Sequence, residues 1–511
     1  MTTIVVFIFF TGVLLLLRNV FLPVGRRNTK AGKPPRLPPG PSGVPFFGSL
    51  LDMARRRDKM GREWLGDMSR YGEMTTLHLG SKTWILLNSD RVVTEIIAKR
   101  GSLTNGRSPM PVASGIVSRN ARSLLLPPSG WTEPRRVMHQ LLNGSALKQY
   151  GSWQELESTQ MMAEYLLQPG RWFRHHYRYA NSTIHRIALG DRLVKSGKDL
   201  EDLQDVVTVF VGSIGRSLVD WFPELDKLPR RLQLWRPYWE KIDRWNHDIY
   251  RSWWDPVVQQ IRDGTPPPSF VRDVLLNPES KYTGSDQDAM YVAMQLIEAG
   301  SDTTREALNT FVMASVCYPQ TFQKAREEVD RICDHDGHLR LPVLDDIHQL
   351  PYICAIIKEL LRWRPIFPMT PDHCLTEDLE FEGYTFPEGV GFVINEIAIS
   401  NEFEDPDSYR PERFLDGHET DVSHGIWQFG GGRRICVGYR LAQRGLLINI
   451  ARLALCFDYS ARGKLDDKVL NHHRTDEPFP INIKVRGERY RELIEKEANA
   501  AGVLELANTR I

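Results

Sequence analysis

Cysteine is scarce in this sequence, and it is scattered rather than clustered. The six cysteines stand at positions 317, 333, 354, 374, 436 and 456, and no two of them form a Cys-x-x-Cys pair. This spacing argues against a zinc ribbon and against a dense disulfide framework. It favours a reducing compartment.

A net charge of one sign is also missing. The chain has 65 Lys and Arg against 64 Asp and Glu, a formal net charge of +1, so no global field attracts nucleic acid. Its 511 residues contain no internal repeat and no second low-complexity seam that would mark a domain boundary. We therefore expect one large domain with a deep interior.

One long apolar run opens the chain. Ile4 to Leu17 is uninterrupted, Arg18-Asn19 break it, and apolar residues resume from Val20. The run is short for the roughly 20 residues of a spanning helix, but Arg18 can snorkel toward the headgroups. We predict a transmembrane anchor over residues 1–24. The alternative, a cleaved signal peptide, lacks a basic residue before the run and a small-x-small cleavage site after it.

Residues 25–45 are basic and rich in proline, and they include Pro34-Pro35-Arg36-Leu37-Pro38-Pro39-Gly40-Pro41. This composition predicts a stiff hinge between the anchor and a folded body at 46–511. Basic residues on the downstream side of an apolar run also favour a cytosolic body.

Helical patterns dominate the body. Ser285 to Cys317 opens with the spacing of a capping box, and 351–364 carries an apolar stripe that ends before Pro365. Alternating residues over 379–395 predict hairpin strands. The expected fold class is mainly α with a minor β-sheet region.

The most informative stretch is Phe429-Gly-Gly-Gly-Arg-Arg-Ile-Cys436-Val-Gly438. Consecutive glycines let backbone approach a flat ligand closely and let N–H groups point at sulfur. Such contacts, with Arg434 nearby, favour a thiolate. A buried, inert cysteine on a glycine turn is the alternative, but it leaves the arginine unexplained.

This stretch fits Phe-x-x-Gly-x-Arg-x-Cys-x-Gly and resembles the haem-binding loop of the cytochrome P-450 family. The resemblance extends over roughly residues 34–482 and implies that fold, with haem b held through Cys436 as the axial iron ligand. Phe429, Gly432, Arg434 and Gly438 would be its loop contacts. A cysteinate on haem iron favours cleavage of dioxygen.

Ala299-Gly300-Ser301-Asp302-Thr303-Thr304 lies inside the long helix, although Gly costs about 1 kcal/mol in a helix interior. Thr303 can hydrogen-bond to the Ala299 carbonyl, while Gly300 removes bulk and is expected to open space for a small ligand. The segment is similar to the acid-alcohol motif of the family, which makes Asp302 and Thr303 the catalytic candidates for proton delivery. A polar patch on an exposed helix face is the alternative.

Two further sets of residues follow from the resemblance. Glu359 and Arg362 would join Arg413, of Pro411-Glu412-Arg413-Phe414, in a buried structural charge triad. Trp131, Arg135, His373 and Arg434 would meet the haem propionates. For His373 an ordinary loop histidine is an equal alternative, and Pro134 stands inside the Trp131-x-x-x-Arg135 motif.

Only 75 residues follow Cys436, too few for a fused flavin reductase. The resemblance therefore implies a separate NADPH-dependent reductase, for which Arg136, Arg433 and Arg440 are candidate contacts. It implies a membrane-anchored monooxygenase of the endoplasmic reticulum, single-pass and facing the cytosol, that oxidises an apolar small molecule, as do fungal members that act on secondary metabolites. A thiolate-haem isomerase or dehydratase, and a haem carrier or sensor without turnover, are the alternatives.

Overall fold

The computed structural model describes residues 23–55, 62–141, 144–193, 198–468 and 477–508. The predicted membrane anchor falls almost wholly outside these ranges, so it stays a prediction. Within them, no helix combines the length and apolar character that crossing a membrane requires.

Helices make up most of the described chain. The α-helices are α2 (Leu50–Arg55), α3 (Arg62–Met68), α4 (Asp90–Val93), α5 (Pro128–Leu141), α6 (Gly144–Leu167), α7 (Trp172–Leu189), α8 (Lys198–Ser213), α9 (Leu218–Trp221), α10 (Arg236–Arg262), α11 (Asp286–Cys317), α12 (Pro319–Cys333), α13 (Pro351–Trp363), α14 (Glu396–Ser400), α15 (Tyr439–Cys456), α16 (Glu488–Ala500) and α17 (Leu504–Asn508). The prediction of a mainly α fold is confirmed.

The strands are short. They are β1 (Met74–Leu79), β2 (Lys82–Leu87), β3 (Asp334–His335), β4 (His338–Leu339), β5 (His373–Cys374), β6 (Leu379–Phe381), β7 (Tyr384–Phe386), β8 (Gly391–Ile394), β9 (Phe457–Ala461) and β10 (Ile481–Val485). One four-stranded sheet has the order β1-β2-β8-β5, with β2 and β8 parallel, and the other sheets have two strands each. The predicted hairpin is β6–β7.

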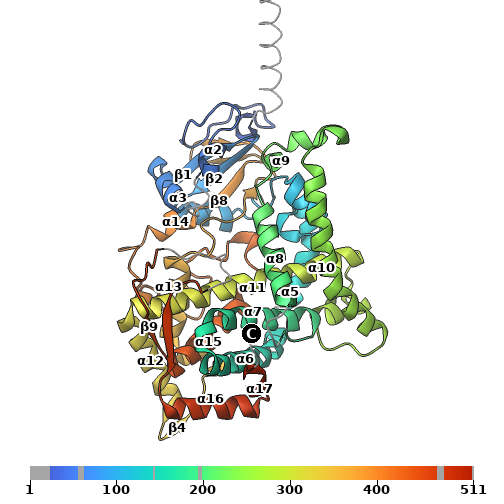
Figure 1. The fold of residues 1–511 in the computed structure, drawn as a ribbon. Helices are drawn as coiled ribbons and strands as arrows, with labels where there is room; N and C mark the ends of the chain where they lie inside the picture. The colour runs from blue at the N-terminus through green and yellow to red at the C-terminus, as the bar shows by residue number, and fades with distance from the viewer. Residues whose placement is uncertain (1–22, 56–61, 142–143, 194–197, 469–476, 509–511) are drawn as a thin grey trace, which may run out of the picture.

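The long helix α11 runs through the middle of the molecule, between the four-stranded sheet at one end and α6, α7 and α16 at the other (Figure 1). Ser285 caps it: its hydroxyl accepts from the Asp288 N–H, and the Asp288 carboxylate accepts in return from the Ser285 N–H. The chain leaves the helix at Tyr318, directly before Pro319. Both predicted ends of this helix are confirmed.

The proline-rich stretch packs on the sheet instead of standing away from it. The Thr76 hydroxyl donates to the Pro38 carbonyl at 2.7 Å, and the Arg36 N–H donates to the Thr385 carbonyl at 3.2 Å. A Cβ on Gly40 would lie 2.0 Å from the Thr76 carbonyl oxygen. Folded structure therefore begins ahead of the expected residue 46, because β1 offers this stretch hydrogen-bond partners.

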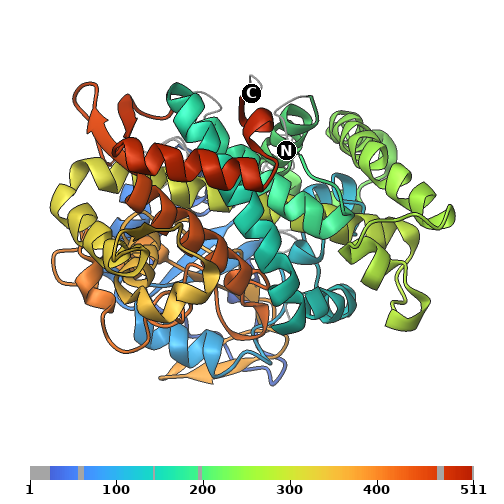
Figure 2. The ribbon, with the colours of Figure 1, turned by 90° about the horizontal axis from the view of Figure 1, so that it is seen from below.

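The charged C-terminal segment forms α16 and α17. Figure 2 shows α16, in red, lying across one side of the helical body. Leu493, Ile494 and Ala498 are buried in the large core cluster that α6, α11, α13 and α15 share. The segment is thus part of the folded domain.

Candidate active site

The loop that carries Cys436 leads into α15. Gly430 and Gly432 have φ of +67° and +58°, which glycine adopts without strain. A Cβ on Gly432 would stand 2.3 Å from the Ile97 carbonyl oxygen. Close packing against the protein's own backbone therefore requires glycine at this position. This reason adds to the predicted one, that glycine lets the loop approach a flat ligand.

The Cys436 thiol is accessible and lies just before the first turn of α15. Desolvation of the sulfur by the protein atoms around it raises the pKa of this thiol, whereas the Gly438 N–H, the charge of Arg135 and the Tyr439 N–H lower it. Backbone N–H groups thus point at the sulfur, as the glycine-rich pattern predicted. Such contacts stabilise a thiolate and tune a metal that it holds. The Cys436 N–H itself donates to the Phe429 carbonyl at 2.7 Å, which closes the loop.

Arg434 reaches from this loop across the site to the segment before α5. Its guanidinium donates to the Asn105 carbonyl at 2.6 and 2.9 Å and to the Leu126 carbonyl at 2.8 Å. It also lies 4.1 Å from the Trp131 ring centroid. Arg434 and Trp131, two predicted haem contacts, therefore meet.

Cations outnumber anions around Arg434. Burial, together with the charges of Arg107 and Arg135, lowers the pKa of Arg434 to about 9, and Asp372 is the carboxylate that opposes them. Like charges in a buried site are costly unless an anion compensates them. Haem carries two carboxylates and its iron can take a thiolate ligand, so this donor set fits haem.

Arg107 is a residue of this cluster that the sequence did not reveal. It is partly buried, and it donates to the Leu124 carbonyl at 2.9 Å and the Asp372 carbonyl at 2.6 Å. Its neighbour Gly106 pairs with Cys374 at the edge of the sheet. In the sequence, an arginine after Asn-Gly cannot be told from a surface arginine. Arg107 reaches the site only because Gly106 pairs with Cys374.

His373 lies on β5 at the same edge and is buried. Its Nδ1 is 3.1 Å from the Thr104 carbonyl, so Nδ1 carries the proton and donates. Burial, reinforced by Arg107, lowers the pKa of His373 to about 3. The imidazole is neutral at pH 7 and presents an unprotonated Nε2.

Trp131 and Arg135 lie on α5, which continues through Pro134. The Arg135 Nε donates to the His139 Nε2 at 3.0 Å, and the Arg135 charge acts on Cys436. The motif therefore keeps its helical spacing in spite of the proline.

The acid-alcohol pair lies on a partly exposed face of α11. The Thr303 hydroxyl donates to the Ala299 carbonyl at 2.9 Å, as predicted. Asp302 forms an ion pair with Arg305 at 3.2 Å. The expectation for Gly300 is wrong: a Cβ there would lie 2.8 Å from Cγ1 of Ile184, so this glycine serves the packing of α7 on α11 and opens no space for a ligand.

The charge triad assembles as expected. Glu359 binds Arg362 through two hydrogen bonds of 2.6 and 2.7 Å and forms an ion pair with Arg413 at 3.5 Å. The Arg410 N–H adds a hydrogen bond of 2.8 Å to the same carboxylate. Burial raises the pKa of Glu359 in spite of these partners. Arg362 also donates to the Pro406 carbonyl at 2.9 Å, so the triad ties α13 to the segment before the cysteine loop.

Comparison with known proteins shows which proteins this chain is similar to. A family model described as "Cytochrome P450" matches residues 38–473. The chain is 32% identical over 500 residues to "Cytochrome P450 monooxygenase verL" of Clonostachys rogersoniana, covering 91% of each chain. It is 30% identical over 516 residues to "Cytochrome P450 monooxygenase virE" of Hypocrea virens, covering 94% of this chain and 91% of the relative.

Solved structures share the fold. The structure titled "Zebra fish cytochrome P450 another structure with Progesterone" superposes with a TM-score of 0.68 at 21% identity, covering 83% of this chain and 99% of that one. The related structure with Abiraterone gives a TM-score of 0.66 at 19% identity, with 83% and 100% coverage.

Proposed function

Because this chain belongs to the cytochrome P450 family, whose monooxygenases incorporate oxygen from dioxygen, we propose that it oxidises an apolar small molecule with electrons that NADPH supplies through a separate reductase. In a hydroxylation, one C–H bond, one dioxygen, two electrons and two protons give one C–OH group and one water. The carrying observation is the accessible Cys436 thiol with two backbone N–H groups directed at it. The fungal origin of the relatives supports a secondary-metabolite intermediate as substrate.

Each part of the site has a task in this proposal. Haem b, bound through Cys436, would supply dioxygen activation. Arg107, Arg135 and Arg434 would hold its carboxylates, and the Gly438 N–H would keep the sulfur in its thiolate form.

The protons come along α11. Asp302 is partly exposed, so it can exchange protons with water, and the neighbouring Thr303 hydroxyl can pass them toward the site. The presence of this pair supports a monooxygenase over an isomerase or dehydratase that needs no dioxygen.

The first test is the spectrum of the reduced, carbon monoxide-bound protein. We expect a thiolate-type Soret band that is absent in Cys436→Ala, and substrate-dependent consumption of NADPH and dioxygen. A well-folded wild-type protein without the band would contradict the haem-thiolate centre. A band without NADPH consumption in a substrate screen would favour a haem carrier or sensor, and turnover without dioxygen an isomerase.

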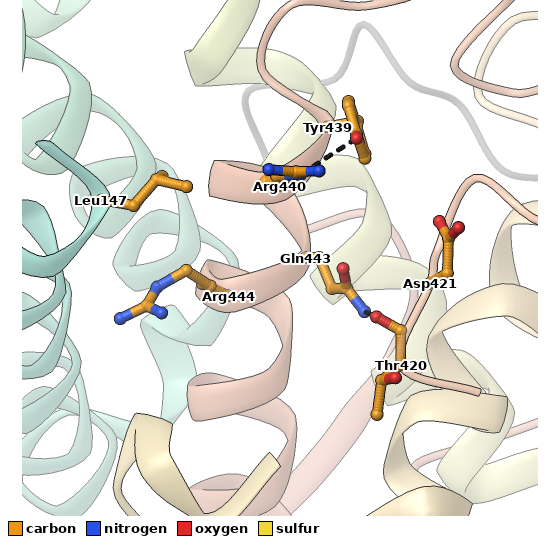
Figure 3. A pocket seen from close by; sticks show the side chains of 7 residues that line it. All are labelled: Leu147, Thr420, Asp421, Tyr439, Arg440, Gln443 and Arg444. Atoms are coloured by element: carbon orange, nitrogen blue, oxygen red, sulfur yellow. Dashed lines mark hydrogen bonds between the residues drawn. The ribbon is translucent and has the colours of Figure 1, made fainter. Parts of the chain in front are cut away.

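We place the docking of the reductase on the cysteine side. Arg433 and Arg440 are exposed, and neither forms an ion pair with any described residue. Arg136 is already paired with Glu133 at 2.7 Å. A pocket of about 330 Å³ opens beside Arg440 at the start of α15 (Figure 3). It is lined by Leu147, Thr420, Asp421, Tyr439, Arg440, Gln443 and Arg444.

Acidic side chains of a reductase fit such unpaired arginines. Arg433→Glu and Arg440→Glu should each slow haem reduction by the reductase about tenfold or more at low salt, with haem content unchanged. Arg136→Glu should have a smaller effect because its charge is already paired. Arg244→Glu on α10 is the matched control, because this exposed arginine also forms no ion pair with any described residue. Unchanged reduction rates in the first two variants would refute this docking face.

The membrane association is proposed from two observations. Residues 23–26 lie beside α9, since the Val24 N–H donates to the Ser81 carbonyl and the Ser81 N–H to the Trp221 carbonyl, both at 3.0 Å. The segment after α9 exposes apolar side chains, with Leu232 at 58% and Leu234 at 85%. We propose a single-pass protein of the endoplasmic reticulum membrane whose body lies in the cytosol and touches the bilayer here.

Deleting residues 1–22 should weaken membrane association, and Leu232→Ser with Leu234→Ser should release the shortened protein further. Cosedimentation with microsomes measures both steps, and Leu415→Ser, another exposed leucine, is the control. If the shortened protein cosediments equally well with and without the two leucine substitutions, these leucines do not contact the membrane. Protease protection of the body in sealed microsomes would refute its cytosolic placement.

A further inference from the structure

Two ion pairs join the segment before α5 to α10 and α11. Arg119 donates two hydrogen bonds to the Asp243 carboxylate of α10, at 2.6 and 2.9 Å. Arg122, which is 1% exposed, forms an ion pair with Glu298 of α11 and donates to the Tyr250 hydroxyl of α10. The same hydroxyl donates to the Glu298 carboxylate. The segment and the two helices are therefore held together around buried charges.

This arrangement lies close to the proposed site of dioxygen activation. Glu298 precedes Thr303 by five residues on α11, which is about 7.5 Å along the helix axis. Ser123 follows Arg122 directly, and its carbonyl accepts from Arg434 at 3.5 Å. A ligand that touches the two ion pairs can therefore also reach the haem site.

Buried polar atoms near the two ion pairs have no partner. Neither atom of the Asn246 amide nor the Tyr291 hydroxyl forms a hydrogen bond with any described residue, although Asn246 is 0% and Tyr291 1% exposed. Asn246 lies about one turn of α10 from Asp243 on one side and from Tyr250 on the other. The Tyr291 and Tyr250 ring centroids are 5.4 Å apart, and the charges of both paired arginines act on the Tyr291 hydroxyl.

These atoms offer hydrogen bonds of both kinds. A buried amide without a partner costs free energy, which a ligand that bonds to it recovers. Burial raises the pKa of Tyr291 to about 12, so its hydroxyl keeps its proton at neutral pH and can donate. A carbonyl oxygen can accept from Asn246 and Tyr291 together, and a hydroxyl group can also donate to the amide oxygen.

The charges nearby select against an ionised ligand. Each arginine of the two ion pairs already has a carboxylate partner. A carboxylate on the ligand would be buried beside these carboxylates without an unpaired cation, and an ammonium group would meet the arginines in the same way. An uncharged oxygen group avoids both costs.

Next to Arg122 the surroundings become apolar. The Phe210 ring of α8 lies 3.6 Å from its guanidinium and belongs to a cluster with Ala113 and Leu125. We propose that the substrate carries an uncharged oxygen group, a carbonyl or a hydroxyl, which Asn246 and Tyr291 bind beside the two ion pairs while its apolar body lies along Phe210. This substrate class rests on the proposed monooxygenase function.

The experiment uses the haem-loaded protein and three probes that share one ring system: naphthalene, 2-acetylnaphthalene and 2-naphthoic acid. Equilibrium dialysis gives the dissociation constant of each probe without turnover. The ketone 2-acetylnaphthalene should bind about tenfold more tightly than naphthalene and than the acid, because it alone brings an uncharged acceptor to the unpaired donors.

Three variants locate the contact. Asn246→Leu should abolish the preference for the ketone and leave the binding of naphthalene within about twofold. Tyr291→Phe should reduce the preference about threefold, since one donor remains. Asn449→Leu is the matched control: it removes an equally buried amide, which donates to the Gly445 carbonyl of α15, and it should keep the full preference.

A tenfold preference for the ketone that Asn246→Leu abolishes supports the proposal. If naphthalene binds as tightly as the ketone, the cluster holds water only, and if the acid binds most tightly, the substrate is an anion; either result overturns the proposal. If Asn246→Leu does not fold, Tyr291→Phe decides it. A wild type without the thiolate-type carbon monoxide band would be a failure of the proposed function, whereas the band without the preference would be a failure of this inference alone.

Discussion

Gly300 is the clearest case in which one residue has a different role from the one its sequence context predicts. A glycine beside an acid-alcohol pair indicated space for a ligand, yet Ile184 of the neighbouring helix packs where a Cβ of this residue would lie. The local pattern could not reveal this, because the contact comes from a residue more than a hundred positions away. The same pattern did predict the Thr303 hydrogen bond, which involves the same helix only.

Gly300→Ala should destabilise the protein by about 1 to 3 kcal/mol, in spite of the better helix propensity of alanine, because the added Cβ overpacks the contact with Ile184. Gly212→Ala in α8 meets no atom within 4 Å and should instead stabilise by about 0.5 to 1 kcal/mol. Urea unfolding measures both variants. Ile184→Val in the Gly300→Ala background should recover part of the loss, and equal effects of the two alanines would contradict this account.

Glu359→Gln should cost about 3 to 5 kcal/mol, because Arg362 and Arg413 would keep buried charges without their carboxylate. Glu412→Gln alters the same region but removes a partner of the exposed Lys324, so it should cost less than about 1 kcal/mol. Denaturant unfolding of the two variants provides the comparison. Similar losses would mean that the triad contributes no more than a surface ion pair.

Among the helices, α7 buries the residues that were least expected in the core from the sequence. It buries His175 and His176, and burial lowers the pKa of each to about 3. Tyr165 and Asn309 bond the two ring nitrogens of His176 at 2.5 and 2.8 Å. The His-His dipeptide gave no usable signal in the sequence, since its partners lie on α6 and α11.

Both histidines should make the protein less stable in acid. Their pKa is lower in the folded state than the ordinary 6.5, so the unfolded chain binds more protons as pH falls from about 6.5 toward 3, and stability is lost over that range. Glu164 acts in the opposite direction: burial raises its pKa to about 7, so its contribution is present below about 4.5 and is lost as pH rises through 7.

Thermal unfolding between pH 7 and pH 5 tests this. We expect the unfolding temperature to fall with pH, and the slope to be shallower in His176→Gln, whereas the exposed His335→Gln should keep the wild-type slope. A wild-type slope in His176→Gln would mean that the neutral imidazole is not what makes the fold acid-sensitive.

At the scale of the whole molecule, the site is assembled from distant stretches: 104–107, 131–135, 372–374 and 429–438. β5 pairs with β8 and with Gly106, which brings the first and third stretches together. The fourth joins them because Arg434 is held by the Asn105 and Leu126 carbonyls.

This convergence predicts that Arg107 matters to haem retention as much as a residue of the cysteine loop. Arg107→Met and Arg434→Met should both speed the loss of haem to a haem-free acceptor protein by about tenfold or more, because each removes a cation from the carboxylate end. Arg340→Met, which breaks the Asp346 pair away from this cluster, should leave the rate unchanged. If Arg107→Met loses haem at the wild-type rate, Arg107 does not help to hold the haem.

The sequence by itself determined what short-range chemistry fixes: the long capped helix, the thiol within a glycine-rich loop, the acid beside an alcohol, and the glutamate three residues before an arginine. Each depends on neighbours within about one helical turn or one loop. Only the tertiary structure decided which atoms oppose each group: Ile184 against Gly300, Arg107 beside Arg434, and Glu306 as the second partner of Arg305. The packing of α7, α8 and α11 and the pairing of β5 and β8 set these contacts, and such long-range packing leaves no local mark in the chain.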